Sequence, residues 1–128
     1  MKRSLLLVDD DEAVRAVTES ALQLVGGWSV TSVGSGIDAL RVTRITVPDA
    51  ILLDVMMPGL DGPATLLELR KDPSTASIPV IFFTAMIVDI DHEALLSTGA
   101  LGVVFKPFDP MNLSIQIAEI LGFGPSEP

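Results

Sequence analysis

The chain has 128 residues, the length of one ordinary domain, and it contains no cysteine. A disulfide framework, a thiol nucleophile and a cysteine-based zinc site are therefore excluded. The formal net charge of -9 opposes direct binding to the phosphate backbone of a nucleic acid.

The N-terminal sequence MKRSLLLVDDD begins like a secretory signal, with two basic residues before an apolar run. That run has only four residues before three aspartates follow, which is too short for the core of a signal peptide. No other apolar run approaches the roughly 20 residues of a membrane span. We therefore expect a soluble protein, located in the cytoplasm and without membrane contact.

Five segments are predicted to be strands. Four are short, continuous apolar runs, which are typical of strands buried on both faces of a sheet: Leu5–Val8, Ala50–Leu53, Val80–Phe83 and Gly102–Phe105. A fifth and weaker candidate is Trp28–Val33, which is rich in β-branched residues.

A helical pattern follows each predicted strand. The first has apolar residues at helical spacing and ends at Gly26-Gly27; these residues are Val14, Val17, Ala21, Leu24 and Val25. The second includes Ile37 and Leu40 and ends before Pro48.

The third helix is expected to begin near Gly62-Pro63, because proline is tolerated in a first turn, and its apolar side has Leu66, Leu67 and Leu69. A fourth is indicated by Ile87, Ile90, Ala94 and Leu95. The fifth is expected to begin at Asp109-Pro110 and to carry an apolar face made of Leu113, Ile117, Ile120 and Leu121.

Five alternations of strand and helix predict an α/β fold with a parallel sheet and helices on both of its faces. We expect a single domain over residues 1–122 and a short, frayed, proline-containing tail over residues 123–128.

Polar residues follow four of the predicted strands. Asp9 and Asp10 follow the first, and the other three positions are Asp54, Thr84 and Lys106. Parallel strands end at one edge of the sheet, where open α/β sheets bind ligands, so these side chains should converge. Lys106 is also the only lysine or arginine after Lys71, which is unusual for a surface charge.

Three converging carboxylates repel one another, and a hard divalent cation with oxygen ligands relieves that repulsion. Mg²⁺ suits such a site, since it binds one or two carboxylates together with water and phosphate oxygens. Lys106 could balance a carboxylate or hold a phosphoryl oxygen, and Thr84 could donate a hydrogen bond to the same group. Asp54 would then be a reasonable phosphoryl acceptor.

The blocks VDDDEAVR, ILLDVMMPGLDG, FTA and FKPF, in this order, resemble those of bacterial response-regulator receiver domains, the CheY-like domains of two-component signalling. The resemblance covers about Ser4 to Leu121. It implies a flavodoxin-like (βα)5 fold, doubly wound, with the five-stranded sheet order 2-1-3-4-5.

The resemblance also implies individual roles. Asp54 would accept the phosphoryl group, while Asp10 and the backbone carbonyl of Met56 would bind Mg²⁺ and Asp9 would assist. Thr84 would follow the phosphoryl group, and Lys106 would contact it. The bond between Lys106 and Pro107 would be cis.

One position departs from the family pattern. Receiver domains usually carry Tyr or Phe three residues before the lysine, where this chain has Val103, and the chain has no tyrosine. Phe105 lies on the same side of the strand and could be a partial substitute. The departure concerns the transmission of the signal rather than phosphoacceptance.

The resemblance implies that a histidine kinase or a histidine phosphotransfer protein is the donor. The output would be a downstream protein or an output domain on the same full-length chain, and a phosphorylation-dependent homodimer is one possible form. The domain would modify only its own carboxylate, so it would not be a turnover enzyme.

Two alternatives remain at this point. A receiver-like scaffold could act through protein contacts without phosphorylation, and Val103 keeps this reading open. A phosphohydrolase of the haloacid dehalogenase type would need a second carboxylate two residues after the nucleophile, where this chain has Met56. The basic residues Arg41, Arg44, Arg70 and Lys71 are interpreted as solvated helix charges.

Overall fold

The computed structural model describes residues 3–85 and 92–122, which form five strands and five helices that alternate along the chain. The strands are β1 (Ser4–Val8), β2 (Ser29–Val33), β3 (Ala50–Asp54), β4 (Val80–Ala85) and β5 (Gly102–Lys106). The helices are α1 (Glu12–Leu24), α2 (Gly36–Ile45), α3 (Gly62–Lys71), α4 (His92–Ser97) and α5 (Leu113–Leu121).

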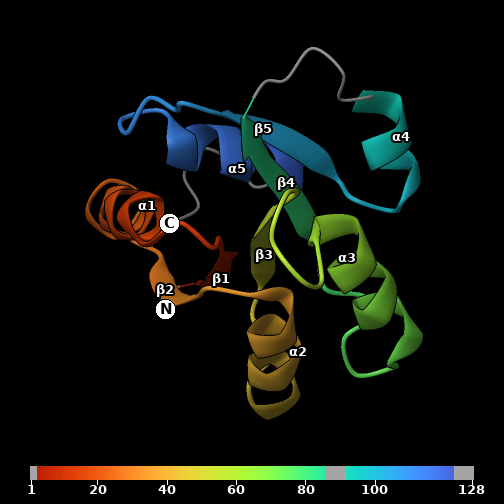
Figure 1. The fold of residues 1–128 in the computed structure, drawn as a ribbon. Helices are drawn as coiled ribbons and strands as arrows, with labels where there is room; N and C mark the ends of the chain where they lie inside the picture. The colour runs from red at the N-terminus through yellow and green to blue at the C-terminus, as the bar shows by residue number, and fades with distance from the viewer. Residues whose placement is uncertain (1–2, 86–91, 123–128) are drawn as a thin grey trace.

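The strands form one parallel sheet in the order β2-β1-β3-β4-β5. Figure 1 shows the strands side by side with helices on both faces. This confirms the predicted α/β class and sheet order. Since the strands are parallel, their carboxyl ends share one edge, called the carboxyl edge below.

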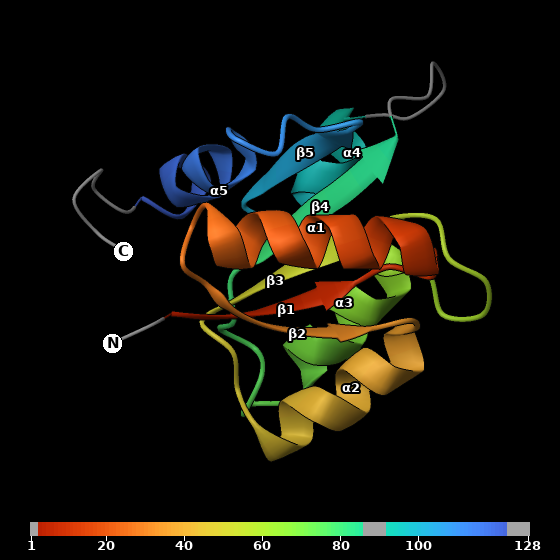
Figure 2. The ribbon, with the colours of Figure 1, turned by 90° about the vertical axis from the view of Figure 1, so that its left-hand side faces the viewer.

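The core has two parts, one on each face of the sheet. Leu22 of α1 and Leu113 and Ile117 of α5 pack against the face that presents Leu7 and Phe83. On the opposite face, side chains of α2, α3 and α4 pack against the sheet: Ala39, Leu66, Leu69 and Leu95. Figure 2 shows α1 and α5 on the side of the sheet away from α2 and α3. Because both faces are covered, β1, β3 and β4 are almost wholly buried, as their continuous apolar sequences predicted.

The apolar stripe expected on α1 is only partly correct. Ala21 is buried, but Val17 is 56% exposed and Leu24 is 85% exposed. Thr18 and Leu22 are buried in their place. Residues three and four apart share a helix face, so Thr18, Ala21 and Leu22 form an equally regular stripe. The hydrophobic pattern did not predict this stripe, because threonine is polar.

The other helices bring smaller corrections. Leu67 of α3 is 58% exposed, whereas Leu66 and Leu69 are fully buried. Ile87 and Ile90 lie outside the described residues, while Ala94 and Leu95 do belong to α4.

The helix α5 begins at Leu113 instead of at Asp109-Pro110. Asp109 instead begins a turn that leads into α5: its carboxylate accepts from the Met111 N–H at 3.0 Å, and its carbonyl accepts from the N–H groups of Asn112 at 2.9 Å and Leu113 at 3.0 Å. A good capping residue therefore marked the turn before the helix instead of the helix itself.

Trp28 marks the end of the sheet opposite to the carboxyl edge. Its side chain is 5% exposed and lies in the cluster with Leu22 and Ile117. The next residue, Ser29, pairs in register with Ser4 at the start of β1. In the described part of the chain, no helix is both long and apolar enough to cross a membrane.

Gly62 lets α3 begin directly against the end of β3. Its N–H donates to the carbonyl of Val55 at 2.9 Å. A Cβ at Gly62 would lie 2.3 Å from the carbonyl oxygen of Asp54 and 2.8 Å from the Val55 Cα, both of which are backbone atoms. Only glycine permits this approach.

We expect Gly62→Ala to lower the free energy of unfolding by about 2 kcal/mol, because the backbone after Asp54 must shift to admit the methyl group. Gly34→Ala is a matched control, because the atoms nearest to its added Cβ, the first at 2.9 Å, belong to the flexible side chain of Arg15 and not to the backbone. Urea unfolding followed by Trp28 fluorescence measures both changes. Equal stability of the two variants would contradict the close-approach argument.

Candidate functional site

The carboxyl edge brings together the acidic residues that the sequence singled out. Asp9 and Asp10 directly follow β1, and Asp54 is the last residue of β3. One carboxylate oxygen from each of the three lies within 4.8 Å of the other two. Asp9 is 0% and Asp54 6% exposed, whereas Asp10 is open to solvent. Two of the three carboxylates are therefore removed from water.

Lys106, at the end of β5, is the cationic partner of this cluster. Its Nζ donates to Asp9 Oδ2 at 2.5 Å and lies 3.5 Å from Asp54 Oδ1. The isolated lysine thus has the acidic partner that its position in the sequence suggested. One ammonium against three carboxylates leaves the cluster with an excess of negative charge.

Aromatic rings form the apolar wall beside Lys106. The Nζ of Lys106 lies 4.9 Å from the centroid of the Phe83 ring, a cation–π distance. The rings of Phe83 and Phe108 are 5.6 Å apart between centroids. The peptide bond between Lys106 and Pro107 is cis, which confirms the prediction. Phe83 was not singled out in the sequence, because it reads there as one more apolar residue of a buried strand.

Burial raises the pKa of Asp54 from 3.8 to about 6. The charge of Asp9 adds to this rise, and that of Asp10 adds less, while Lys106 and a hydrogen bond from the backbone N–H of Met56 oppose it. The anionic form of Asp54 is therefore poorly stabilised by the protein alone.

Asp9 is held at each of its polar groups. Its N–H donates to the Val33 carbonyl at 3.2 Å, and its Oδ1 accepts from the Asp11 N–H at 2.9 Å. Its carbonyl accepts from Arg15 Nη1 at 2.8 Å. The carboxylate of Asp11 caps α1 by accepting from the N–H groups of Ala13 and Val14. The loop that carries the acidic residues is thus fixed by several elements.

Thr84 lies at this edge but does not join the carboxylates. Its side chain is 1% exposed, and its hydroxyl contacts the carbonyl of Ala85 at 3.4 Å. Met56 places its side chain outward, with 61% exposed, and the N–H of Met56 faces Asp54. The roles of the Thr84 hydroxyl and the Met56 carbonyl remain predictions.

Val103 packs, partly buried, against the cluster formed by α2, α3 and α4. Phe105 pairs in register with Thr84. The nearest aromatic residue of β5 to Thr84 is therefore beside it in the sheet, two residues beyond the position that the family pattern uses.

The donor set of the carboxyl edge fits Mg²⁺. All three candidate side chains are carboxylates, the hard oxygen ligands that this cation prefers, and Asp10 faces the solvent from which water ligands would come. A divalent cation would also offset the negative charge that Lys106 leaves unbalanced.

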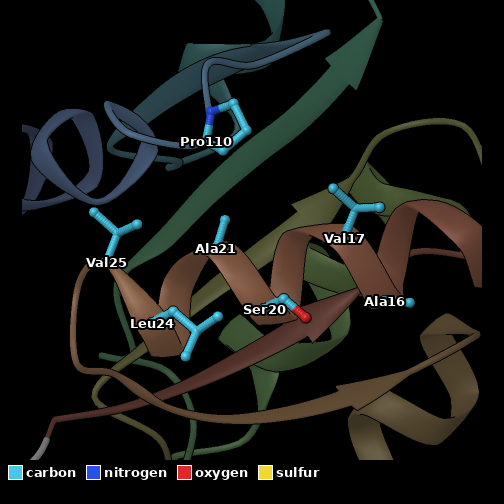
Figure 3. Close-up of a pocket in the computed structure, with 7 residues that line it drawn as sticks. All are labelled: Ala16, Val17, Ser20, Ala21, Leu24, Val25 and Pro110. Carbon is cyan, nitrogen blue, oxygen red and sulfur yellow. The ribbon is translucent and has the colours of Figure 1, made fainter.

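A groove along α1 is chemically different from this site (Figure 3). Pro110 faces α1 across the groove, whose lining is Ala16, Val17, Ser20, Ala21, Leu24, Val25 and Pro110. The lining contains no charged side chain, and Ser20 is its one polar residue, so it lacks the carboxylates and the lysine of the carboxyl edge.

Arg70 is not the solvated helix charge that the sequence predicted. Arg41 forms an exposed ion pair with Asp38, as expected of a solvated charge. The guanidinium of Arg70, in contrast, is half-buried and donates to the carbonyl of Ile78 at 2.8 Å, and burial lowers the pKa of Arg70. Its contact with the Gly99 carbonyl at 3.4 Å also ties α3 to the loop before β5.

The raised pKa of Asp54 predicts how pH affects stability. Because the folded state holds the proton more tightly, the stability that Asp54 contributes is present below its unfolded value of 3.8 and is lost as pH rises through about 6. In EDTA at about pH 8, Asp54→Asn should raise the free energy of unfolding by on the order of 2 kcal/mol. The gain should shrink towards pH 5.

Urea unfolding across this pH range provides the measurement. Asp38→Asn is the control, because it removes the same formal charge from an aspartate whose side chain is 42% exposed. Unchanged or reduced stability of Asp54→Asn at the higher pH would contradict the argument from burial.

Comparison with known proteins agrees with this arrangement. The family model for the response regulator receiver domain matches residues 5–118. The transcriptional regulatory protein AfsQ1 of Streptomyces coelicolor is 39% identical over 124 residues, which are 97% of this chain and 53% of that protein. A probable transcriptional regulator of Guillardia theta is 37% identical over 120 residues, covering 94% of this chain and 46% of that protein.

Solved structures share the fold over their full length. A putative response regulator from Chloroflexus aurantiacus has a TM-score of 0.87 and 33% identity, covering 95% of this chain and 99% of that one. The receiver domain of the sensor histidine kinase PA1611 from Pseudomonas aeruginosa has a TM-score of 0.84 and 32% identity over the same shares, and its crystal structure has a magnesium ion in the active-site cleft.

This chain spans about half the length of the transcriptional regulators that it matches. The family match covers most of the chain, and both the sheet order and the acidic carboxyl edge agree with it. The chain belongs to the response regulator receiver domains of two-component systems.

Proposed function

We propose that this receiver domain accepts a phosphoryl group on Asp54 in a Mg²⁺-dependent reaction. The observation that supports this most is the poorly stabilised anion of Asp54, which lies buried beside two further carboxylates and one lysine. A bound cation would stabilise this anion, and Lys106 is close enough to Asp54 to contact a phosphoryl group that Asp54 carries.

In this proposal, Mg²⁺ would be held by Asp9, Asp10, Asp54 and the Met56 carbonyl. The bound cation would offset the negative charges of the acceptor and of the phosphoryl group. A carboxylate oxygen of Asp54 forms a bond to phosphorus, and the bond from phosphorus to the donor's histidine nitrogen breaks. The electron pair returns to that nitrogen, so the phosphoryl group moves without an oxidant or reductant.

Lys106 changes partner during the transfer. Its ammonium neutralises Asp9 in the structure. The same ammonium lies 3.5 Å from Asp54 Oδ1, so it would be in place to contact a phosphoryl oxygen on Asp54 if a bound cation offset the charge of Asp9. Thr84 would exchange its long contact with the Ala85 carbonyl for a shorter one to the same phosphoryl group.

The donor would be a histidine kinase or a histidine phosphotransfer protein. Since the transcriptional regulators matched by this chain are about twice its length, the output would belong to an additional domain or to a separate partner. The domain modifies its own side chain and is therefore a switch, not a turnover enzyme.

One observation favours a second candidate, a scaffold that binds its partner without phosphorylation. Val103 occupies the position at which family members have an aromatic ring, and it packs against the core as an ordinary strand residue. It has no ring to rotate inward when Thr84 moves. A partner that binds Asp54→Asn as tightly as the parent chain would support the scaffold.

The experiment is to incubate the chain with Mg²⁺ and acetyl phosphate and to record its intact mass. We expect one phosphoryl group in the parent chain, and none in Asp54→Asn or in EDTA. If no phosphodonor gave the adduct, phosphoacceptance by Asp54 would be refuted, and the hypothesis of a scaffold that acts without phosphorylation would be favoured.

The same assay tests Lys106. Lys106→Met should reduce the rate of phosphorylation by about a hundredfold, because one charged group that stabilises the transferred phosphoryl is lost. Lys71→Met is the matched control, since Lys71 is 64% exposed and pairs only with Glu68 among the described residues. Equal rates for the two lysine variants would remove Lys106 from the mechanism.

A further inference from the structure

Arg15 contacts the loop that carries the acidic residues and has no part in the mechanism above. It lies in the first turns of α1, and its Nη1 donates to the backbone carbonyl of Asp9 at 2.8 Å. Glu12 and Glu19 lie three and four residues away on the same helix, the usual spacing for a surface ion pair. Among the described residues, neither forms an ion pair with Arg15. The guanidinium thus turns to the loop and away from the helix surface.

Gly34 makes room for this guanidinium. A Cβ at Gly34 would lie 2.9 Å from Arg15 Nη1 and 3.6 Å from its Cζ, and the three atoms nearest to it all belong to this guanidinium. Gly34 is not among the glycines with positive φ, so an alanine fits the backbone there. The Arg15 guanidinium therefore occupies the space that a side chain at position 34 would fill.

The bond from Arg15 acts on Asp10 through the geometry of the peptide. The carbonyl of Asp9 and the N–H and Cα of Asp10 lie in one plane, because the peptide bond does not rotate freely. A hydrogen bond that fixes the Asp9 carbonyl oxygen therefore also fixes the orientation of the peptide plane that ends at the Cα of Asp10. This matters for Asp10 in particular, since it is exposed and belongs to the three-carboxylate cluster.

We propose that Arg15 is a positioning residue of the cation site, which orients the Asp9–Asp10 peptide so that the Asp10 carboxylate faces the cation. The inference rests on the proposed Mg²⁺ binding. It predicts a change opposite in sign to simple electrostatics: loss of a positive charge near a cation site should tighten binding, whereas loss of positioning should weaken it.

The test is a titration of the full chain with MgCl2, followed by the amide NMR shifts of residues 9–11 and 54. Arg15→Met should raise the Kd for Mg²⁺ about tenfold, as is typical when a group that orients a metal ligand is lost. Gly34→Ala should also raise the Kd for Mg²⁺, because the added methyl group displaces the Arg15 guanidinium without changing the charge of the protein. The double variant should bind no more weakly than Arg15→Met alone, because both changes remove one contact.

Arg41→Met is the matched control, because it removes the same charge from an arginine of α2 that is 68% exposed and pairs with Asp38. A Kd for Arg15→Met equal to or below that of the control would overturn the proposal, as would an unchanged Kd for Gly34→Ala. Should Arg15→Met fail to fold, Gly34→Ala still decides the question.

Different results would contradict the positioning role of Arg15 and the phosphorylation of Asp54. No saturable Mg²⁺ binding by the parent chain would overturn both the positioning role and the proposed function. Mg²⁺ binding that Arg15→Met weakens, without phosphorylation of Asp54 by any donor, would uphold the positioning role and refute the phosphoryl transfer.

Discussion

The balance between three carboxylates and one ammonium governs the carboxyl edge of this domain. Asp9 and Asp54 have lost most of their water, and among the described residues Lys106 is the one cation that pairs with their carboxylates. A buried pair that lacks full compensation costs free energy of folding. The same deficit makes the edge receptive to a cation, which would offset the charge of the carboxylates and of any phosphoryl group added to Asp54.

Contacts to the backbone hold the loops that carry these charged groups. The loop after β1 is held by Val33, Asp11 and Arg15, and α3 begins against the end of β3 because Gly62 has no side chain. The acidic groups therefore stand on a frame whose positions are fixed by neighbouring strands. Rearrangement after phosphorylation would be confined to groups with weak contacts, such as the Thr84 hydroxyl.

The sequence was sufficient to predict the convergence of Asp9, Asp54 and Lys106, because parallel strands oblige the residues that follow them to share an edge. It was not sufficient for features that depend on how segments meet. The buried face of α1 includes Thr18, which hydrophobic periodicity cannot identify, and the true start of α5 lies beyond a turn that Asp109 begins. Arg15 and Arg70 bind backbone carbonyls in the loops next to their own helices, and an arginine that does so has the same local sequence pattern as one in solvent.

The position of Trp28 has a practical consequence. It is the only tryptophan, the chain has no tyrosine, and it is buried at the end of the sheet opposite to the acidic cluster. Its emission therefore comes from a single site with one defined environment. Bound ions and modified carboxylates lie about one strand length away, where they have little direct quenching effect on it. The domain thus contains an intrinsic probe of global unfolding that is separate from the events at its own functional edge.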